Sequence, residues 1–273
     1  MRTSAVLAAL ALAAAATAAP QPQVSAATSA APVSSGTSAA PPSSGSSGSG
    51  QLAGLWNMRG YLGSAGHTAR ERIAHDVNGN LPPMLPWARD LLEKRVTDAD
   101  VGGHLFANVD TRCLPQGVPY LIFGAVEGPI QIFEEQGEVM VIVEEGAEIW
   151  DIYLNAKHPP LDDIEPTFHG DSVGHWEGDT LVVDTVGLNT KTTLDQVGMP
   201  HSDALHVITR VRRTDASTLE FMVTIDDPKT FSAPWTRRVI YKQSKPGERR
   251  REYVCENSRN APDAQGYQSF QTR

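Results

Sequence analysis

Residues 167–213 read TFHGDSVGHWEGDTLVVDTVGLNTKTTLDQVGMPHSDALHVITRVRR, and this stretch decides the fold. Within it, residues 180–186 (TLVVDTV) and 205–211 (LHVITRV) alternate in side-chain character with a period of two, as β-strands do. Glu177-Gly178-Asp179 marks a tight turn before the first of these segments. The stretch therefore predicts consecutive short strands joined by turns.

The rest of the folded part repeats this pattern. One helix is expected at residues 86–98, because Pro86 suits a first helical turn and apolar residues follow at helical spacing. Short strands between Gly, Asp and Pro turns are expected at residues 120–123, 129–134, 138–144, 148–154, 173–176, 180–186, 205–213, 218–226, 235–242 and 251–256. This spacing indicates a mainly β, antiparallel, barrel-like domain of the lipocalin or calycin type. A closed barrel is preferred because closure leaves few strand edges to protect.

Composition divides the chain into three parts. Residues 1–18 have the features of a signal peptide: a positive start at Arg2, an apolar stretch, and small residues at a cleavage site. Residues 19–50 carry no charge and consist almost entirely of Ala, Ser, Gly, Pro, Thr, Val and Gln, which predicts a disordered linker. Residues 51–273 are long enough for a single β-barrel-like domain. The apolar stretch of the leader is too short to span a membrane.

Charge and cysteine content restrict the partners and the compartment. The formal net charge is −9, and it becomes −10 once a leader containing Arg2 is removed, which argues against nucleic acid or an anionic membrane as a partner. Cys113 and Cys255 are the only cysteines, and two cysteines in an exported chain are most simply a disulfide. A reactive thiol is the alternative. The protein is therefore expected to be secreted or periplasmic.

The strongest chemical candidates lie on the two alternating segments. Asp184 shares a strand face with Val182 and Val186, and His206 shares a face with Arg210 on the next segment. Buried charges are costly unless they pair, so these groups are expected to form a polar cluster inside the β-domain and to serve as catalytic residues. The structural alternative is a salt bridge between the carboxylate and the guanidinium.

Further candidates lie in the flanking segments. His201 and His169 are expected to be catalytic, because histidine exchanges protons near neutral pH and both lie in loop-like segments. For His169 the alternative is a side chain in a turn that caps a strand. Four residues are expected to bind substrate, although core packing is the alternative for the two tryptophans: Ser172, Asp203, Trp176 and Trp235.

Other chemistries are less well supported by the sequence. There is no Gly-x-Ser-x-Gly motif, so a serine nucleophile is not favoured. His169, His201, His206 and Asp184 could supply metal ligands, but His201 and His206 are oddly spaced and would face opposite ways in one strand. No Gly-x-Gly-x-x-Gly or phosphate-binding loop is present, so no nucleotide cofactor is expected.

Several strings resemble an uncharacterised family of exported bacterial proteins. They are PPMLPW at 82–87, RCLP at 112–115, WEGDTLVVDT at 176–185, PHSDALH at 200–206, DDP at 226–228, PW at 234–235 and EYVCEN at 252–257. The resemblance covers nearly the whole domain but implies no particular activity. That family usually has an acidic residue where this chain has Thr209. Gly54-Leu55-Trp56 resembles, more weakly, the opening of lipocalin-like barrels.

Two classes of function follow. The first is a cofactor-free enzyme that moves protons on a small organic molecule, of lyase, isomerase or cyclase type. The second is a lipocalin-like protein that binds a small organic or apolar ligand without catalysis. An envelope protein with no small-molecule role is a third possibility.

Overall fold

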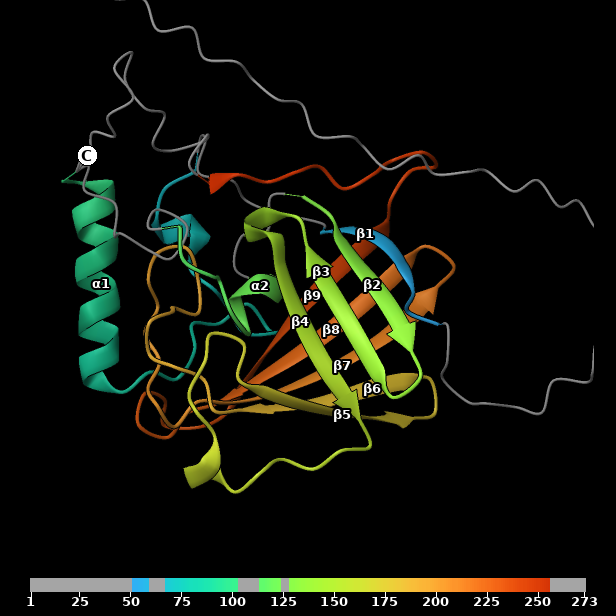
Figure 1. Cartoon of the computed structure of the whole chain (residues 1–273). Coiled ribbons are helices and arrows are strands. Elements are labelled where there is room, and N and C mark those ends of the chain that lie inside the picture. Colours follow the sequence, from blue (N-terminus) through green and yellow to red (C-terminus); the bar gives the residue numbers. More distant parts are fainter. Residues whose placement is uncertain (1–50, 59–66, 103–112, 124–127, 256–273) are drawn as a thin grey trace, which may run out of the picture. The chain divides into compact units, whose positions relative to one another are not determined.

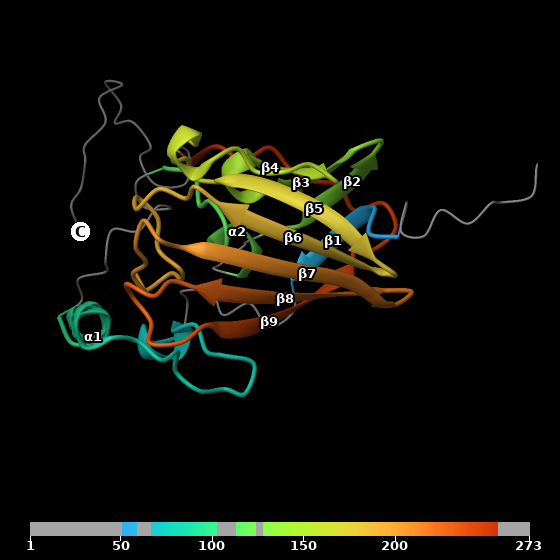
Figure 2. The same cartoon turned by 90° about the horizontal axis from the view of Figure 1, so that it is seen from below.

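The computed structural model describes residues 51–58, 67–102, 113–123 and 128–255. The expected signal peptide and linker lie outside the described residues. The described strands form one closed, nine-stranded barrel (Figures 1 and 2), which confirms the predicted mainly β, barrel-like fold. Its strands are β1 (Gly54–Met58), β2 (Ile130–Glu135), β3 (Glu138–Val143), β4 (Glu148–Leu154), β5 (Asp171–Glu177), β6 (Thr180–Val186), β7 (His206–Asp215), β8 (Thr218–Asp226) and β9 (Trp235–Gln243).

Hydrogen bonding between the first and last strands closes the barrel. Trp56 to Met58 of β1 pair with Gln243 to Tyr241 of β9, and β1 also pairs with β2. All other neighbours are antiparallel except β4 and β5, which are parallel through Tyr153↔Val173. A parallel pair requires a long connection, and here residues 155–170 supply it. This connection also carries His158, a residue of the candidate site.

Two expected strands have a different structure. Residues Tyr120–Phe123 form a short helix, α2, instead of a strand, and the described residues 251–255 are not in a strand. All four residues of α2 are buried, and Figures 1 and 2 both place it within the ring of strands. The Tyr241 hydroxyl of β9 donates a hydrogen bond to the Ile122 carbonyl, with an O···O distance of 2.7 Å. A short apolar run cannot distinguish a buried helix from a buried strand, which explains the wrong prediction.

Helix α1 (Pro86–Asp100) confirms the predicted helix and extends two residues beyond it. Its buried residues Ala88, Leu92 and Val96 recur every four positions, so one stripe of the helix faces the domain. The described residues also include the short 3-10 helices η1 (Arg70–Arg72), η3 (Glu145–Ala147) and η4 (Leu161–Asp163).

Many of the inward-facing side chains form one apolar core cluster. β3 alternates strictly, and its Val139, Val141 and Val143 are buried. Some of the largest fully buried side chains are aromatic, namely Trp56, Trp150, Phe221 and Tyr241. The connection between β6 and β7 contributes further buried apolar residues, including Leu194 and Met199. Most of the stability therefore comes from burial of apolar surface in and around the barrel.

Candidate functional site

Asp184 lies on the outer face of the barrel, whereas the sequence predicted that it would lie in the interior. Leu181, Val183 and Thr185 are the β6 residues that face inward, each no more than 1% exposed. The outward neighbour Val182 is also buried, at 8% exposure. Because both faces of β6 are apolar, their alternation shows which side chains share a face but not which face is turned to the core. The expectation of a cluster inside the β-domain is therefore corrected to a cluster on its outer surface.

Four titratable side chains meet on this surface, and we call them the outer His–Asp cluster: His158, Asp171, Asp184 and His206. The Nε2 atom of His206 lies 2.8 Å from Asp184 Oδ1. The Nε2 atom of His158 lies 3.2 Å from the same oxygen, and its Nδ1 atom lies 2.5 Å from Asp171 Oδ1. All four side chains are partly exposed, from 21% for His158 to 41% for Asp184.

The fold explains how these residues meet. Asp184 on β6 pairs with Ile208 on β7, which places it diagonally across from His206 on the same face. Asp171 begins β5 and pairs with Val186, two residues along from Asp184. His158 belongs to the long connection between β4 and β5. No periodic pattern marks that connection in the sequence, so His158 was missed as a candidate.

The two imidazoles of the cluster have different hydrogen-bonding environments. Both ring nitrogens of His158 face carboxylates, so donation to both at once requires a proton on each nitrogen. His206 uses only Nε2, and among the described residues its Nδ1 atom has no hydrogen-bond partner. Asp184 therefore orients His206 and leaves one of its nitrogens available, an arrangement suited to general acid–base chemistry.

Arg210 does not join the outer His–Asp cluster. It lies four positions after His206 along β7, which corresponds to about 13 Å between their Cα atoms. Its guanidinium instead pairs with Glu177, with an N···O distance of 2.6 Å. It also lines a surface pocket of ≈ 330 Å³ with Thr180, Arg212, Glu220, Met222 and Arg238. The predicted convergence of Asp184, His206 and Arg210 thus holds for the first two residues only.

His201 is buried in the connection between β6 and β7. Its Nε2 atom lies 2.7 Å from the Thr192 hydroxyl oxygen, and its Nδ1 atom lies 3.0 Å from the Ser202 carbonyl oxygen. Nearby Asp203 is exposed and pairs with Lys229. The described hydrogen bonds and ion pairs of these two residues do not include any member of the outer His–Asp cluster.

Burial of His201 predicts a decline in stability on acidification. Desolvation lowers the pKa of His201 below its ordinary value of 6.5. Below that pH, His201 is protonated in the unfolded chain more readily than in the folded protein. The free energy of unfolding should therefore fall as the pH decreases from about 6.5. His201→Gln should make this fall shallower, by at most about 1.4 kcal/mol per pH unit. Urea denaturation at several pH values measures it, with exposed His175→Gln as the control. Equal slopes for wild type and His201→Gln would contradict the prediction.

His169, which was expected to be catalytic, pairs with Glu148, a residue that the sequence did not single out. Its Nε2 atom lies 2.8 Å from Glu148 Oε2. The same buried carboxylate accepts hydrogen bonds from the backbone N–H groups of Gln116 (2.5 Å) and Gly117 (3.1 Å). Gly117 has a φ of +71°, and a Cβ there would lie 2.2 Å from the Phe168 carbonyl oxygen, so the close approach requires glycine. The start of β4 is thereby tied to the segment leading into α2.

The remaining substrate-binding candidates face the inside of the barrel or its edge. The Ser172 hydroxyl accepts a hydrogen bond from Trp150 Nε1 and lies 2.8 Å from the Thr185 hydroxyl oxygen. Trp235 is 4% exposed, and Trp176 is partly buried against the core. Because these side chains face inward, they could contact a ligand in the barrel but not one at the outer His–Asp cluster.

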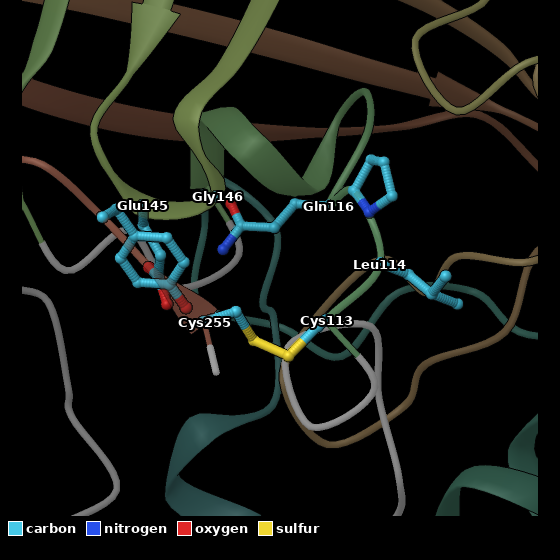
Figure 3. A pocket seen from close by; sticks show the side chains of 8 residues that line it. Cys113, Leu114, Gln116, Glu145, Gly146 and Cys255 are labelled. Carbon is cyan, nitrogen blue, oxygen red and sulfur yellow. A yellow bond between two sulfur atoms is a disulfide. The ribbon is translucent and has the colours of Figure 1, made fainter. Parts of the chain in front are cut away.

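The predicted disulfide is confirmed: Cys113 and Cys255 are bonded across a sequence separation of 142 residues. A pocket of ≈ 170 Å³ lies beside it (Figure 3), lined by Cys113, Leu114, Pro115, Gln116, Glu145, Gly146, Tyr253 and Cys255. Figure 3 shows the Gln116 side chain pointing toward Gly146, while Leu114 points away from the disulfide. The disulfide therefore joins the segment before α2 to the described end of the chain.

No group of three or more His, Cys, Asp or Glu side chains in the described residues is arranged to hold a metal ion. None of the described helices is long and apolar enough to cross a membrane. No protein-family profile, curated protein or solved structure matches the chain.

Proposed function

We propose that the protein is an exported, cofactor-free enzyme that transfers protons on a small organic molecule at the outer His–Asp cluster. The observation that carries the proposal is that Asp184 holds Nε2 of His206 while Nδ1 of the same ring has no partner among the described residues. A carboxylate that orients an imidazole in this way fixes its tautomer and stabilises its charged form. The cluster thus combines an available base with a group that stabilises the protonated base.

Each residue has a separate role in this proposal. His206 Nδ1 removes a proton from a carbon of the substrate, and the electron pair left behind forms a new double bond or ring bond. The proton is then returned to a second atom of the product or to a leaving group, so the reaction is of lyase, isomerase or cyclase type. Asp184 positions His206, and His158, which is held by Asp171, positions Asp184. No external oxidant or reductant is required.

Two observations support the location outside the cytoplasm. The sequence begins with a leader that has the features of a signal peptide, and the Cys113–Cys255 disulfide suits an oxidising compartment. Ligand binding without catalysis, the alternative expected from the sequence, would place the ligand inside the barrel, away from the outer His–Asp cluster.

Deuterium exchange tests the enzyme proposal without knowledge of the natural substrate. Purified protein is incubated in D2O with a panel of small ketones, aldehydes and α,β-unsaturated acids, and deuterium uptake and conversion are followed by mass spectrometry. Wild type should accelerate exchange or conversion of at least one compound. His206→Gln should lower that rate by roughly 10²- to 10⁴-fold, the usual contribution of a general base. Asp184→Asn should lower it as well.

The matched control is His175→Gln. His175 also faces outward on β5, but it is 55% exposed and its ring nitrogen pairs with Glu177 only. This variant should retain the wild-type rate. The proposal fails if no compound reacts faster than in buffer, or if His206→Gln and His175→Gln react alike.

A further inference from the structure

Arg237 is a cation inside the barrel. It lies on β9 between Trp235 and Val239, both of which are buried. Side chains two residues apart on a strand share a face, and Tyr241 on this face reaches α2 within the barrel. The neighbouring Arg238 faces outward and pairs with Glu220. The chain thus places one arginine on each side of the same strand.

Among the residues that the structure describes, the Arg237 guanidinium has no hydrogen-bond or ion-pair partner. Among the described residues, the charged group that influences its pKa is Asp195, whose carboxylate already accepts hydrogen bonds from the backbone N–H groups of Ala74, Val197 and Met199. Desolvation by the surrounding protein lowers the pKa of Arg237. Five N–H donors of a largely desolvated cation are therefore available to an acceptor.

Aromatic and polar groups surround this cation. The Phe123 ring lies 5.1 Å from Arg237 Cζ, and it also packs against Trp235 at a centroid distance of 6.4 Å. The buried Trp235 Nε1 atom and the buried Thr209 Oγ1 atom have no hydrogen-bond partner in the described structure. Thr209 pairs with Val223, which pairs with Arg237, so the hydroxyl lies about 10 Å away on the same inner surface.

We infer that the interior of the barrel at Arg237 binds a small organic carboxylate. The carboxylate accepts hydrogen bonds from the guanidinium, which matches its geometry in a two-point interaction. Trp235 Nε1 and the Thr209 hydroxyl supply further polar contacts, and the organic part of the ligand packs against Phe123. The anion compensates a charge that is costly to leave unpaired. This site is separate from the outer His–Asp cluster and does not depend on the proposed enzyme activity.

Isothermal titration calorimetry with benzoate and with its neutral analogue benzamide tests the inference, in a chloride-free buffer. Wild type should bind benzoate and not benzamide. Arg237→Met should weaken benzoate binding by roughly 10- to 100-fold, the loss of a charge-assisted hydrogen-bond pair. Arg238→Met, which removes the outward arginine of the same strand, should bind benzoate as wild type does. Thr209→Val should weaken binding by a smaller factor.

Thermal melts without ligand give an independent result. Arg237→Met should melt at the same temperature as wild type or a few degrees higher, because it removes an unpaired charge from a desolvated position. If Arg237→Met does not fold, Arg237→Lys is used in its place. Lysine lacks the planar guanidinium that binds a carboxylate at two points, so this variant should still bind benzoate more weakly than wild type. The inference is wrong if benzoate does not bind, if benzamide binds equally, if chloride competes with equal affinity, or if Arg237→Met and Arg238→Met bind alike.

Discussion

Replacing Cys113 and Cys255 with serine together should lower the free energy of unfolding by about 5 kcal/mol. The bond closes a loop with a sequence separation of 142 residues, and constraining so long a loop in the unfolded chain gives this value in the chain-entropy model. The loss would be a large part of the stability of a typical domain. Urea denaturation of the double variant and of unreduced wild type measures it.

Thiol alkylation supplies the control for this comparison. Among the described residues no cysteine is free, so unreduced wild type should not be labelled, whereas reduced wild type should be labelled twice and should melt like the double variant. Labelling of both cysteines without reduction would contradict the bond. A loss below about 1 kcal/mol would show that the unfolded chain is already constrained by residual structure.

Asp195→Ala should lower the free energy of unfolding by about 3–5 kcal/mol, because it leaves buried donors without an acceptor. Asp195 is 1% exposed and accepts three backbone hydrogen bonds, from Ala74, Val197 and Met199. The bond from Ala74 connects the segment before α1 to the connection between β6 and β7, whereas the other two lie within that connection.

The pH dependence of the Asp195→Ala effect has a definite sign. Burial raises the pKa of Asp195 above its ordinary value of 3.8. The folded protein therefore keeps the Asp195 carboxyl protonated to a higher pH than the unfolded chain does. The difference in free energy of unfolding between wild type and Asp195→Ala should consequently become smaller as the pH rises above about 4. Urea denaturation at several pH values measures this. Asp98→Ala is the control, since Asp98 is exposed and pairs with Lys94; it should cost about 0.5 kcal/mol or less. Equal losses for the two variants would contradict the prediction.

The two proposals use opposite faces of the barrel wall. The outer His–Asp cluster lies on the outside of β5, β6 and β7, whereas Arg237 lies on the inside of β9. A variant at one site should therefore leave the other unchanged. The sites work independently if His206→Gln still binds benzoate and Arg237→Met still shows turnover. Loss of both functions in either variant would indicate coupling through the barrel.

The sequence by itself determined the strand pattern, the cysteine pair and the shared face of Asp184 and His206. These properties depend on local periodicity, on composition and on the turn residues between strands, all of which can be read along the chain. The helix at Pro86 was predictable for the same reason. The barrel architecture followed from many short strands at regular spacing.

Only the tertiary structure decided which strand face is turned inward and which distant residues meet. Closure joins β1 to β9 across most of the domain, and this long-range pairing sets the inner and outer faces. It places Asp184 on the outer surface and brings His158 to it from an irregular connection. It also places Arg237 on the inner face, where no described residue forms a hydrogen bond or ion pair with it. Alternation along one strand carries no information about these contacts, because they depend on how separate strands pack around a common core.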